Sequence, residues 1–137
     1  MILGIGTDLV DIRRIAKSIS HFGNHFLNRI FTSKEQDLLS QRRLQAASYA
    51  KNFAAKEATA KALGTGMRAG VSWQDIEILR NELGAPQVLL HGPSAERLQQ
   101  LTPSGMVAKI HLALTDEWPY AQAFVMLSAI PEVIRKG

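Results

Sequence analysis

The chain has 137 residues, 46% of them hydrophobic, which suits one domain with a modest core. It has no cysteine, which excludes disulfides and thiolate metal sites. We see no signal-like leader and no apolar run near the ~18 residues of a membrane span, so we expect a cytoplasmic protein. The net charge of +4 indicates an acidic partner, which charge alone leaves open between nucleic acid, a phosphorylated cofactor and an acidic protein.

Residues 2–10 alternate in character and are rich in β-branched side chains, which predicts a first strand. One face is expected to meet the core, and it consists of Leu3, Ile5, Thr7 and Leu9. The other face presents Gly4, Gly6 and Asp8. Glycine within a strand often marks close approach by a ligand or another backbone, and a carboxylate beside it suits a metal–phosphate site. The alternative is that Asp8 caps the helix that follows.

Helical spacing and capping signals then predict four helices before the next strand. They cover residues 11–20, 21–28, 32–40 and 44–63. The second is short and begins in a turn. Thr32 and Glu35 fit a capping box at the start of the third. The fourth is the longest, is rich in alanine, and ends at the glycines of Gly64-Thr65-Gly66.

The long helix carries charged residues in a pattern that suits binding. Phe53, Glu57 and Lys61 are four residues apart and share one face. Glu57 could bind a hard cation, and Lys56 and Lys61 could hold phosphate. The alternative is a solvated helix surface, in which the Glu57–Lys61 pair contributes a few tenths of a kcal/mol.

Strands dominate the second half of the chain. They are predicted within residues 71–80, 87–91, 107–114 and 120–127, with a helix over 93–101. Turns at 84–86 and 115–119 join the strands into two hairpins. Helices grouped early and antiparallel strands grouped late predict an α+β fold. We expect a single domain over residues 1–128 and a C-terminal tail over 129–137.

Two separated motifs together have a recognisable form. They read Gly4-x-Gly6-x-Asp8-x-Val10-x-x-x-Arg14 and Phe53-Ala54-x-Lys56-Glu57-Ala58-x-x-Lys61-Ala62-x-Gly64-Thr65-Gly66. This pair strongly resembles the holo-acyl-carrier-protein synthase family, the small 4′-phosphopantetheinyl transferases. The resemblance continues in the expected order through residues 26–32, 73–78, 84–86, 111–117 and 120–125, and so covers nearly the whole chain.

The resemblance implies an activity and a site. The activity is transfer of 4′-phosphopantetheine from coenzyme A, the co-substrate, to a serine of apo acyl carrier protein, with release of 3′,5′-ADP, in support of fatty acid biosynthesis. Asp8 and Glu57 match the family's Mg²⁺ ligands, and with Lys61 they form the expected catalytic set. Coenzyme A is expected to contact Lys61 and the turn of Gly64, Thr65 and Gly66. Lys56 is expected either in this cofactor-binding group or on the surface.

Other positions leave the chemistry open. The base that deprotonates the serine is expected to be a metal-bound water, Glu57 or Glu35, while His111 reads as structural. Asn52 stands where family members often carry arginine, although Lys51 could reach the same region. Asp116 lies near a position where some relatives carry histidine.

The resemblance also implies partners. Arg14 and Phe26 match carrier-binding residues, and basic groups around an apolar anchor suit an acidic carrier protein; a solvated basic face with a buried Phe26 is the alternative. Family members form homotrimers with active sites between subunits, and the apolar late strands partly suit such a contact, although a monomer is possible. No nucleic-acid or membrane partner is expected. Two other classes stay open: a metal-dependent phosphodiester or pyrophosphate hydrolase, and a basic nucleic-acid-binding module.

Overall fold

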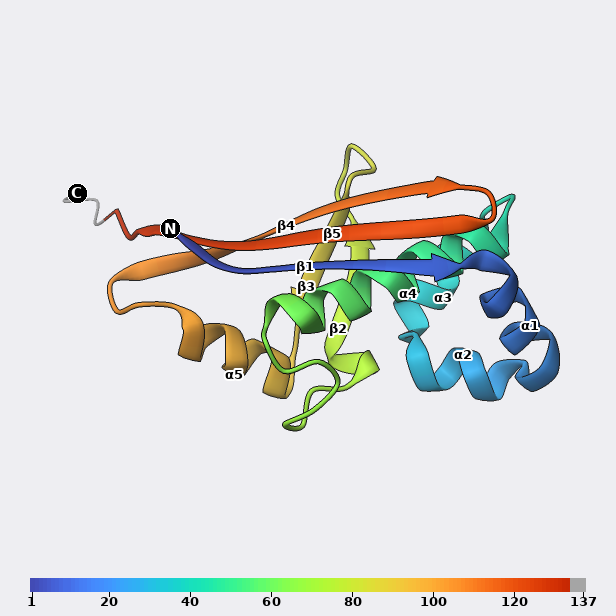
Figure 1. The fold of residues 1–137 in the computed structure, drawn as a ribbon, viewed down its shortest axis with the longest axis horizontal. Coiled ribbons are helices and arrows are strands. Elements are labelled where there is room, and N and C mark those ends of the chain that lie inside the picture. Colours follow the sequence, from blue (N-terminus) through green and yellow to red (C-terminus); the bar gives the residue numbers. More distant parts are fainter. Residues whose placement is uncertain (134–137) are drawn as a thin grey trace.

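A computed structural model describes residues 1–133 and has an α+β architecture (Figure 1). Its helices are α1 (Ile12–Phe22), α2 (Asn24–Ile30), α3 (Ser33–Leu39), α4 (Gln45–Ala62), the 3-10 turn η1 (Trp73–Asp75) and α5 (Gly92–Leu101). Its strands are β1 (Ile2–Asp11), β2 (Ile76–Arg80), β3 (Pro86–Leu90), β4 (Met106–Glu117) and β5 (Tyr120–Pro131). The predicted order of elements and the fold class are confirmed.

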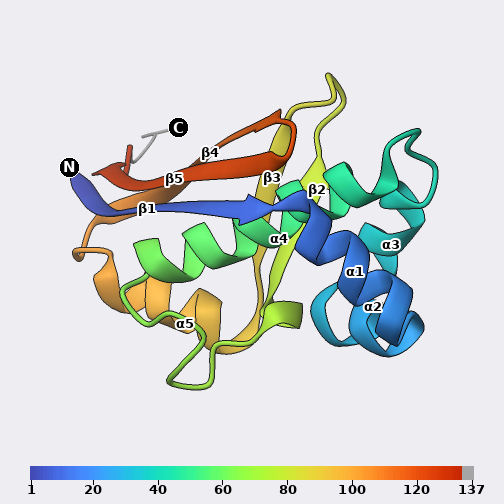
Figure 2. The ribbon, with the colours of Figure 1, turned by 45° about the vertical axis from the view of Figure 1, so that its right-hand side comes forward.

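The strands form two antiparallel sheets. The larger has the order β1-β5-β4, so the first strand pairs with the last, and the smaller is the β2-β3 hairpin. Helix α4 runs beneath β1 and β5, and α1 to α3 gather at one end of the molecule (Figure 2). Among the described residues, no helix covers the opposite face of the large sheet, and none is long and apolar enough to cross a bilayer.

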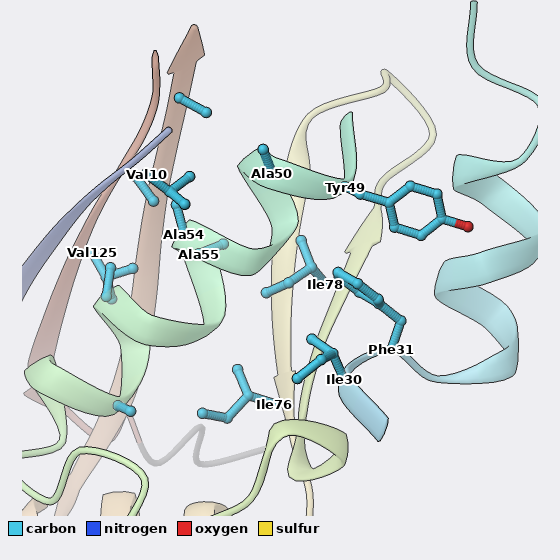
Figure 3. Close-up of a cluster of buried hydrophobic side chains, with 14 of the residues drawn as sticks. Val10, Ile30, Phe31, Tyr49, Ala50, Ala54, Ala55, Ile76, Ile78 and Val125 are labelled. Carbon is cyan, nitrogen blue, oxygen red and sulfur yellow. The ribbon is translucent and has the colours of Figure 1, made fainter. Parts of the chain in front are cut away.

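The core is built around the small side chains of α4. Ala54 and Ala55 are completely buried between the large sheet, which contributes Val125, and the hairpin, which contributes Ile76 (Figure 3). At the far end, Phe31 packs edge-on against Tyr49, with ring centroids 4.9 Å apart. Because alanine has no side chain beyond Cβ, it lets the helix axis approach the sheet closely.

From Ile5 onward the two faces of β1 are the reverse of the prediction, whereas Leu3 packs against the core as expected. Ile5 and Leu9, which were expected in the core, are 60% and 62% exposed. The glycine face packs on α4 instead, and a Cβ at Gly4 or Gly6 would overlap a backbone carbonyl oxygen of that helix. The prediction was wrong because alternation separates two faces of a strand, while the partner helix decides which of them is buried.

Local signals at the element boundaries were more accurate. The capping box is confirmed: the Glu35 N–H donates to Thr32 Oγ1 at 3.2 Å, and the Thr32 N–H donates to Glu35 Oε1 at 2.8 Å. Strand β5 runs to Pro131 and buries Ala129, so residues 129–131 belong to the sheet and not to a tail. Of the expected tail, residues 134–137 lie outside the described residues.

Candidate active site

The close contact of β1 with α4 brings Asp8, Glu57 and Lys61 together. The Lys61 ammonium donates to Asp8 Oδ1 at 3.1 Å and to the Thr7 carbonyl oxygen at 3.0 Å. Asp8 does not cap the following helix, because Asp11 accepts from the Arg13 N–H at 2.9 Å in that role. The Asp8 carboxylate is therefore available to a site on the face where strand and helix meet.

The charges in this group do not balance. Burial raises the pKa of Glu57, and the negative charge of Asp8 raises it further, while Lys61 opposes both effects. Two carboxylates and one ammonium leave a net charge of −1. No group of three or more acidic, histidine or cysteine side chains in residues 1–133 is placed to hold a metal. Two carboxylates do fit Mg²⁺, which completes its octahedron with waters and substrate phosphates.

The turn after α4 has a defined set of backbone bonds. Gly64 and Gly66 have positive φ angles of 80° and 57°, which glycine adopts without strain. The Gly64 N–H donates to Lys61 O at 3.0 Å, and the Gly66 N–H donates to Ala60 O at 3.0 Å. Within residues 1–133, the N–H of Thr65 has no protein acceptor, so it is the backbone donor of this turn that a ligand can use.

Lys56 is placed away from this open group. It is 0% exposed, and its ammonium donates to Glu35 Oε1 at 2.7 Å and to the carbonyl oxygens of Trp73 and Ile76 at 2.8 and 2.6 Å. Burial lowers its pKa, against the attraction of Glu35. Lys56 is therefore neither in the cofactor-binding group nor on the surface, the two places expected for it: its side chain joins α4 to α3, η1 and β2.

Glu35 is removed from the candidates for a base by the same contacts. Its side chain is 0% exposed, and Oε2 accepts from the Ile78 N–H at 2.9 Å. Within the chain, His111 lies away from Glu57, on the uncovered face of the sheet, with its Nε2 2.9 Å from Ser128 Oγ. Of the side chains considered for this role, Glu57 is the one that lies in the site.

The positions that depart from the family pattern occupy one region. Asn52 is buried on α4, where it cannot extend to an outside phosphate. Lys51 forms an ion pair with Asp116 at 3.2 Å. This pair links α4 to the end of β4 and partly neutralises the lysine that was expected to substitute for the missing arginine.

Two contacts near the site were not predicted. Phe53, on the face of α4 that carries Glu57, stacks on Trp73 with ring centroids 4.8 Å apart. Arg97 of α5 donates to the carbonyl oxygen of Leu63, next to the glycine turn, at 2.9 Å. Trp73 lies in a matching segment and was available as a signal, whereas no sequence pattern marks Arg97.

The expected carrier-binding residues lie along two adjoining hollows of α1 and α2. One, of about 500 Å³, is lined by Arg14, Lys17, Ser18, His21 and Phe22. The other, of about 220 Å³, is lined by Ser18, Phe22, His25, Phe26 and Arg29. Arg14 is exposed, whereas Phe26 is half-buried and meets Phe31 edge-on. The more exposed apolar ring is Phe22, at 62%, which the sequence reading missed.

Comparison with known proteins gives the class to which this fold and site belong. The sequence pattern of the 4′-phosphopantetheinyl transferase superfamily matches residues 4–122. The chain belongs to that superfamily, and the predicted family resemblance is confirmed.

The similar curated proteins are holo-[acyl-carrier-protein] synthases. The one from Parvibaculum lavamentivorans is 52% identical over 132 residues, covering 96% of this chain and 99% of the relative. The one from Rhodopseudomonas palustris strain HaA2 is 56% identical over 135 residues, covering 96% of each. Among solved structures, the synthase from Neisseria meningitidis has a TM-score of 0.82 at 38% identity, covering 93% of this chain and 99% of that one.

A second solved structure is described with a ligand. The Bacillus anthracis synthase, in complex with CoA (3′,5′-ADP), has a TM-score of 0.72 at 30% identity and covers 93% of this chain and 96% of that one.

Proposed function

We propose that this protein transfers 4′-phosphopantetheine from coenzyme A to a serine of apo acyl carrier protein in the cytoplasm, for fatty acid biosynthesis. The observation that carries the proposal is the meeting of Asp8, Glu57 and Lys61 across β1 and α4. The names of the relatives and the ligand of the Bacillus anthracis structure support the two substrates.

The reaction moves one phosphoryl group between two oxygens. The serine oxygen forms a bond to the β-phosphorus of coenzyme A, the bond to the bridging oxygen breaks, and 3′,5′-ADP leaves with that oxygen. Such transfers depend mainly on positioning and charge neutralisation. We assign the Lys61 ammonium and the Thr65 N–H to the phosphates. Of the side chains considered as the base, Glu57 is the one that lies beside Asp8 and Lys61, so we assign it to accept the serine proton.

Asp8 and Glu57 are the residues that would hold Mg²⁺. Their donor set fits the ion, since it provides two carboxylates and an uncompensated negative charge. When bound, the ion would neutralise charge on the diphosphate. Lys61 already contacts Asp8, so it would hold that carboxylate in place while the ion is absent.

The test mixes the protein with coenzyme A, magnesium and apo acyl carrier protein, and follows the intact mass of the carrier. We expect a phosphopantetheine adduct that depends on magnesium, and loss of most turnover in Asp8→Ala and Glu57→Ala with the fold retained. Asp11→Ala is the matched control, because it removes a carboxylate of the same strand that caps α1 and pairs with the Arg13 guanidinium. Activity in excess chelator would reject the metal, and hydrolysis of coenzyme A without labelling the carrier would favour the hydrolase.

We also propose that Arg14 and Phe26 contact the carrier. The two adjoining hollows combine basic side chains with the apolar rings of Phe22 and Phe26. The basic side chains would attract an acidic helical partner, and the apolar rings would hold it.

The uncovered face of the large sheet supports the proposal of a homotrimer. Ile5, Leu9 and Phe124 project from it and are 60%, 62% and 41% exposed, and Met126 lies opposite Ile5 on the neighbouring strand. Contiguous apolar surface of this kind marks a contact with another protein chain. Light scattering should give three times the 15.1 kDa chain mass, and Leu9→Glu should lower it. A fully active species with the mass of one chain would contradict the trimer.

A further inference from the structure

Arg97 reaches from α5 to the last turn of α4. Its Nε donates to the carbonyl oxygen of Leu63, the residue that caps α4, at 2.9 Å. Its Nη2 would lie 3.5 Å from a Cβ built on Gly64. The guanidinium thus lies against the start of the Gly64–Gly66 turn as well as on the helix terminus.

The base of this contact is buried and hydrogen-bonded. Ser94, one turn earlier on α5, is completely buried, and its hydroxyl donates to His91 O at 2.8 Å and to Asp75 O at 3.2 Å. The turn itself has two glycines with positive φ, which gives it backbone freedom that its own bonds only partly restrict. An arginine fixed on α5 therefore supplies an external anchor for the turn.

The charge of Arg97 matters because of the helix terminus that it contacts. Anions bind well at helix N-termini, whereas the C-terminus of a helix carries partial negative charge on its unpaired carbonyls. The turn assigned to coenzyme A phosphates follows a C-terminus, the unfavourable end. Lys61 lies in the last turn of α4, but its ammonium is directed to Asp8 and Thr7. Arg97 is the cation that binds the terminal carbonyl itself.

We propose that Arg97 is a positioning residue for coenzyme A: it fixes the Gly64–Gly66 turn and offsets the negative end of α4 beneath it. The inference rests on the proposed function, which assigns coenzyme A to this turn. Arg97 acts through the Leu63 carbonyl and not on the transferred phosphoryl group. Its loss should therefore weaken binding of coenzyme A while the turnover rate at saturation is kept.

The test compares Arg97→Gln and Arg97→Lys by titrating coenzyme A at saturating carrier. We expect the KM for coenzyme A to rise about tenfold in Arg97→Gln, the size of a charge effect at a partly buried helix terminus, with kcat and the carrier KM unchanged. Arg97→Lys keeps the charge and a donor, so its KM should stay within about threefold of wild type.

Thr102→Val is the matched control. Thr102 Oγ1 donates to Leu98 O at 2.7 Å, so the variant loosens the far end of α5 without touching the turn. It should lower the melting temperature as Arg97→Gln does and leave the coenzyme A KM unchanged. If Thr102→Val and Arg97→Gln raised the coenzyme A KM equally, the cause would be general loosening of α5, and the positioning role would be overturned. The role would also be overturned if Arg97→Lys raised this KM as much as Arg97→Gln does.

Calorimetry separates this inference from the function on which it rests. Wild-type protein that does not bind coenzyme A would reject the proposed function. Wild-type protein that binds it, with an equal affinity in Arg97→Gln, would reject the role of Arg97 alone.

Discussion

Gly6→Ala is expected to separate the two elements that carry the active site. Gly6 lies on the face of β1 that packs on α4, two residues before Asp8 and on the same side of the strand. A methyl group there would overlap the Ala58 carbonyl oxygen and would lie 2.8 Å from the Ala62 nitrogen. Both neighbours are backbone atoms of a regular helix, so no flexible side chain can move aside.

The size of the effect follows from how far β1 and α4 must move apart to accommodate the methyl group. Ordinary contacts of carbon lie at about 3.5–4.0 Å, so relieving the overlap with the Ala58 oxygen requires strand and helix to separate by about 1.5–2 Å. Overpacking of this kind costs about 1–3 kcal/mol, which corresponds to a melting temperature lower by roughly 5–10 °C. The same displacement moves Asp8 away from Glu57 and Lys61, and a misplacement of about 1 Å can cost a factor of 100 in rate.

The assay measures carrier labelling and thermal unfolding on the same preparations. Gly105→Ala is the control: its φ of 79° makes alanine strained, but no atom lies within 4 Å of the added Cβ. It should lose about 1 kcal/mol of stability and keep full turnover. If Gly6→Ala kept wild-type turnover at a temperature where it is folded, the close approach of β1 to α4 would not be what sets the site.

Three further predictions concern other groups. Lys56→Met should cost about 3–5 kcal/mol in urea unfolding, because it leaves the Glu35 carboxylate buried without a cation and the Trp73 and Ile76 carbonyls without their donor. A loss below about 1 kcal/mol would contradict this. The pKa of Glu57 is raised in the folded protein, so the protonated side chain favours folding at low pH, and this stabilisation is lost as the pH rises through the folded-state pKa. Glu57→Gln, which stays neutral, should therefore raise the melting temperature at pH 7 but not near pH 4. Arg14→Glu should raise the KM for the carrier, and the increase should be smaller in high salt because ions screen the charge. Phe26→Ala should speed dissociation of the carrier equally at low and high salt. If both variants titrate the carrier as the wild type does, the carrier docks elsewhere.

Much of the fold was predictable because its signals are local. The alanine-rich composition gave the long helix, the terminal glycines its end, and Thr32 with Glu35 the start of α3. The orientation of β1 was not predictable, because it depends on a helix about fifty residues away. Glycine was the available clue, since a bare strand face suits another backbone as well as a ligand.

The same distinction applies to the site. Spacing on one helix face predicted that Glu57 and Lys61 lie together, and the family motifs added Asp8. Lys56 lies one residue off that face, and only the tertiary structure shows that Glu35 and two carbonyl groups surround it. Arg97 acts through a main-chain oxygen, a partner that any residue could supply, so no pattern of side chains marks it.

The pairing of β1 with β5 has a consequence for how the protein is made. Asp8 is aligned with Ala123, 115 residues later in the chain. At synthesis rates of about 5–20 residues per second, β1 waits roughly 6–23 s on the ribosome before its partner strand exists. Helix α4 is complete well before then, but within residues 1–133 β5 is the one strand that pairs with β1. The hydrogen bonds that hold β1, and with it Asp8, in the sheet therefore form only after the last strand has been made.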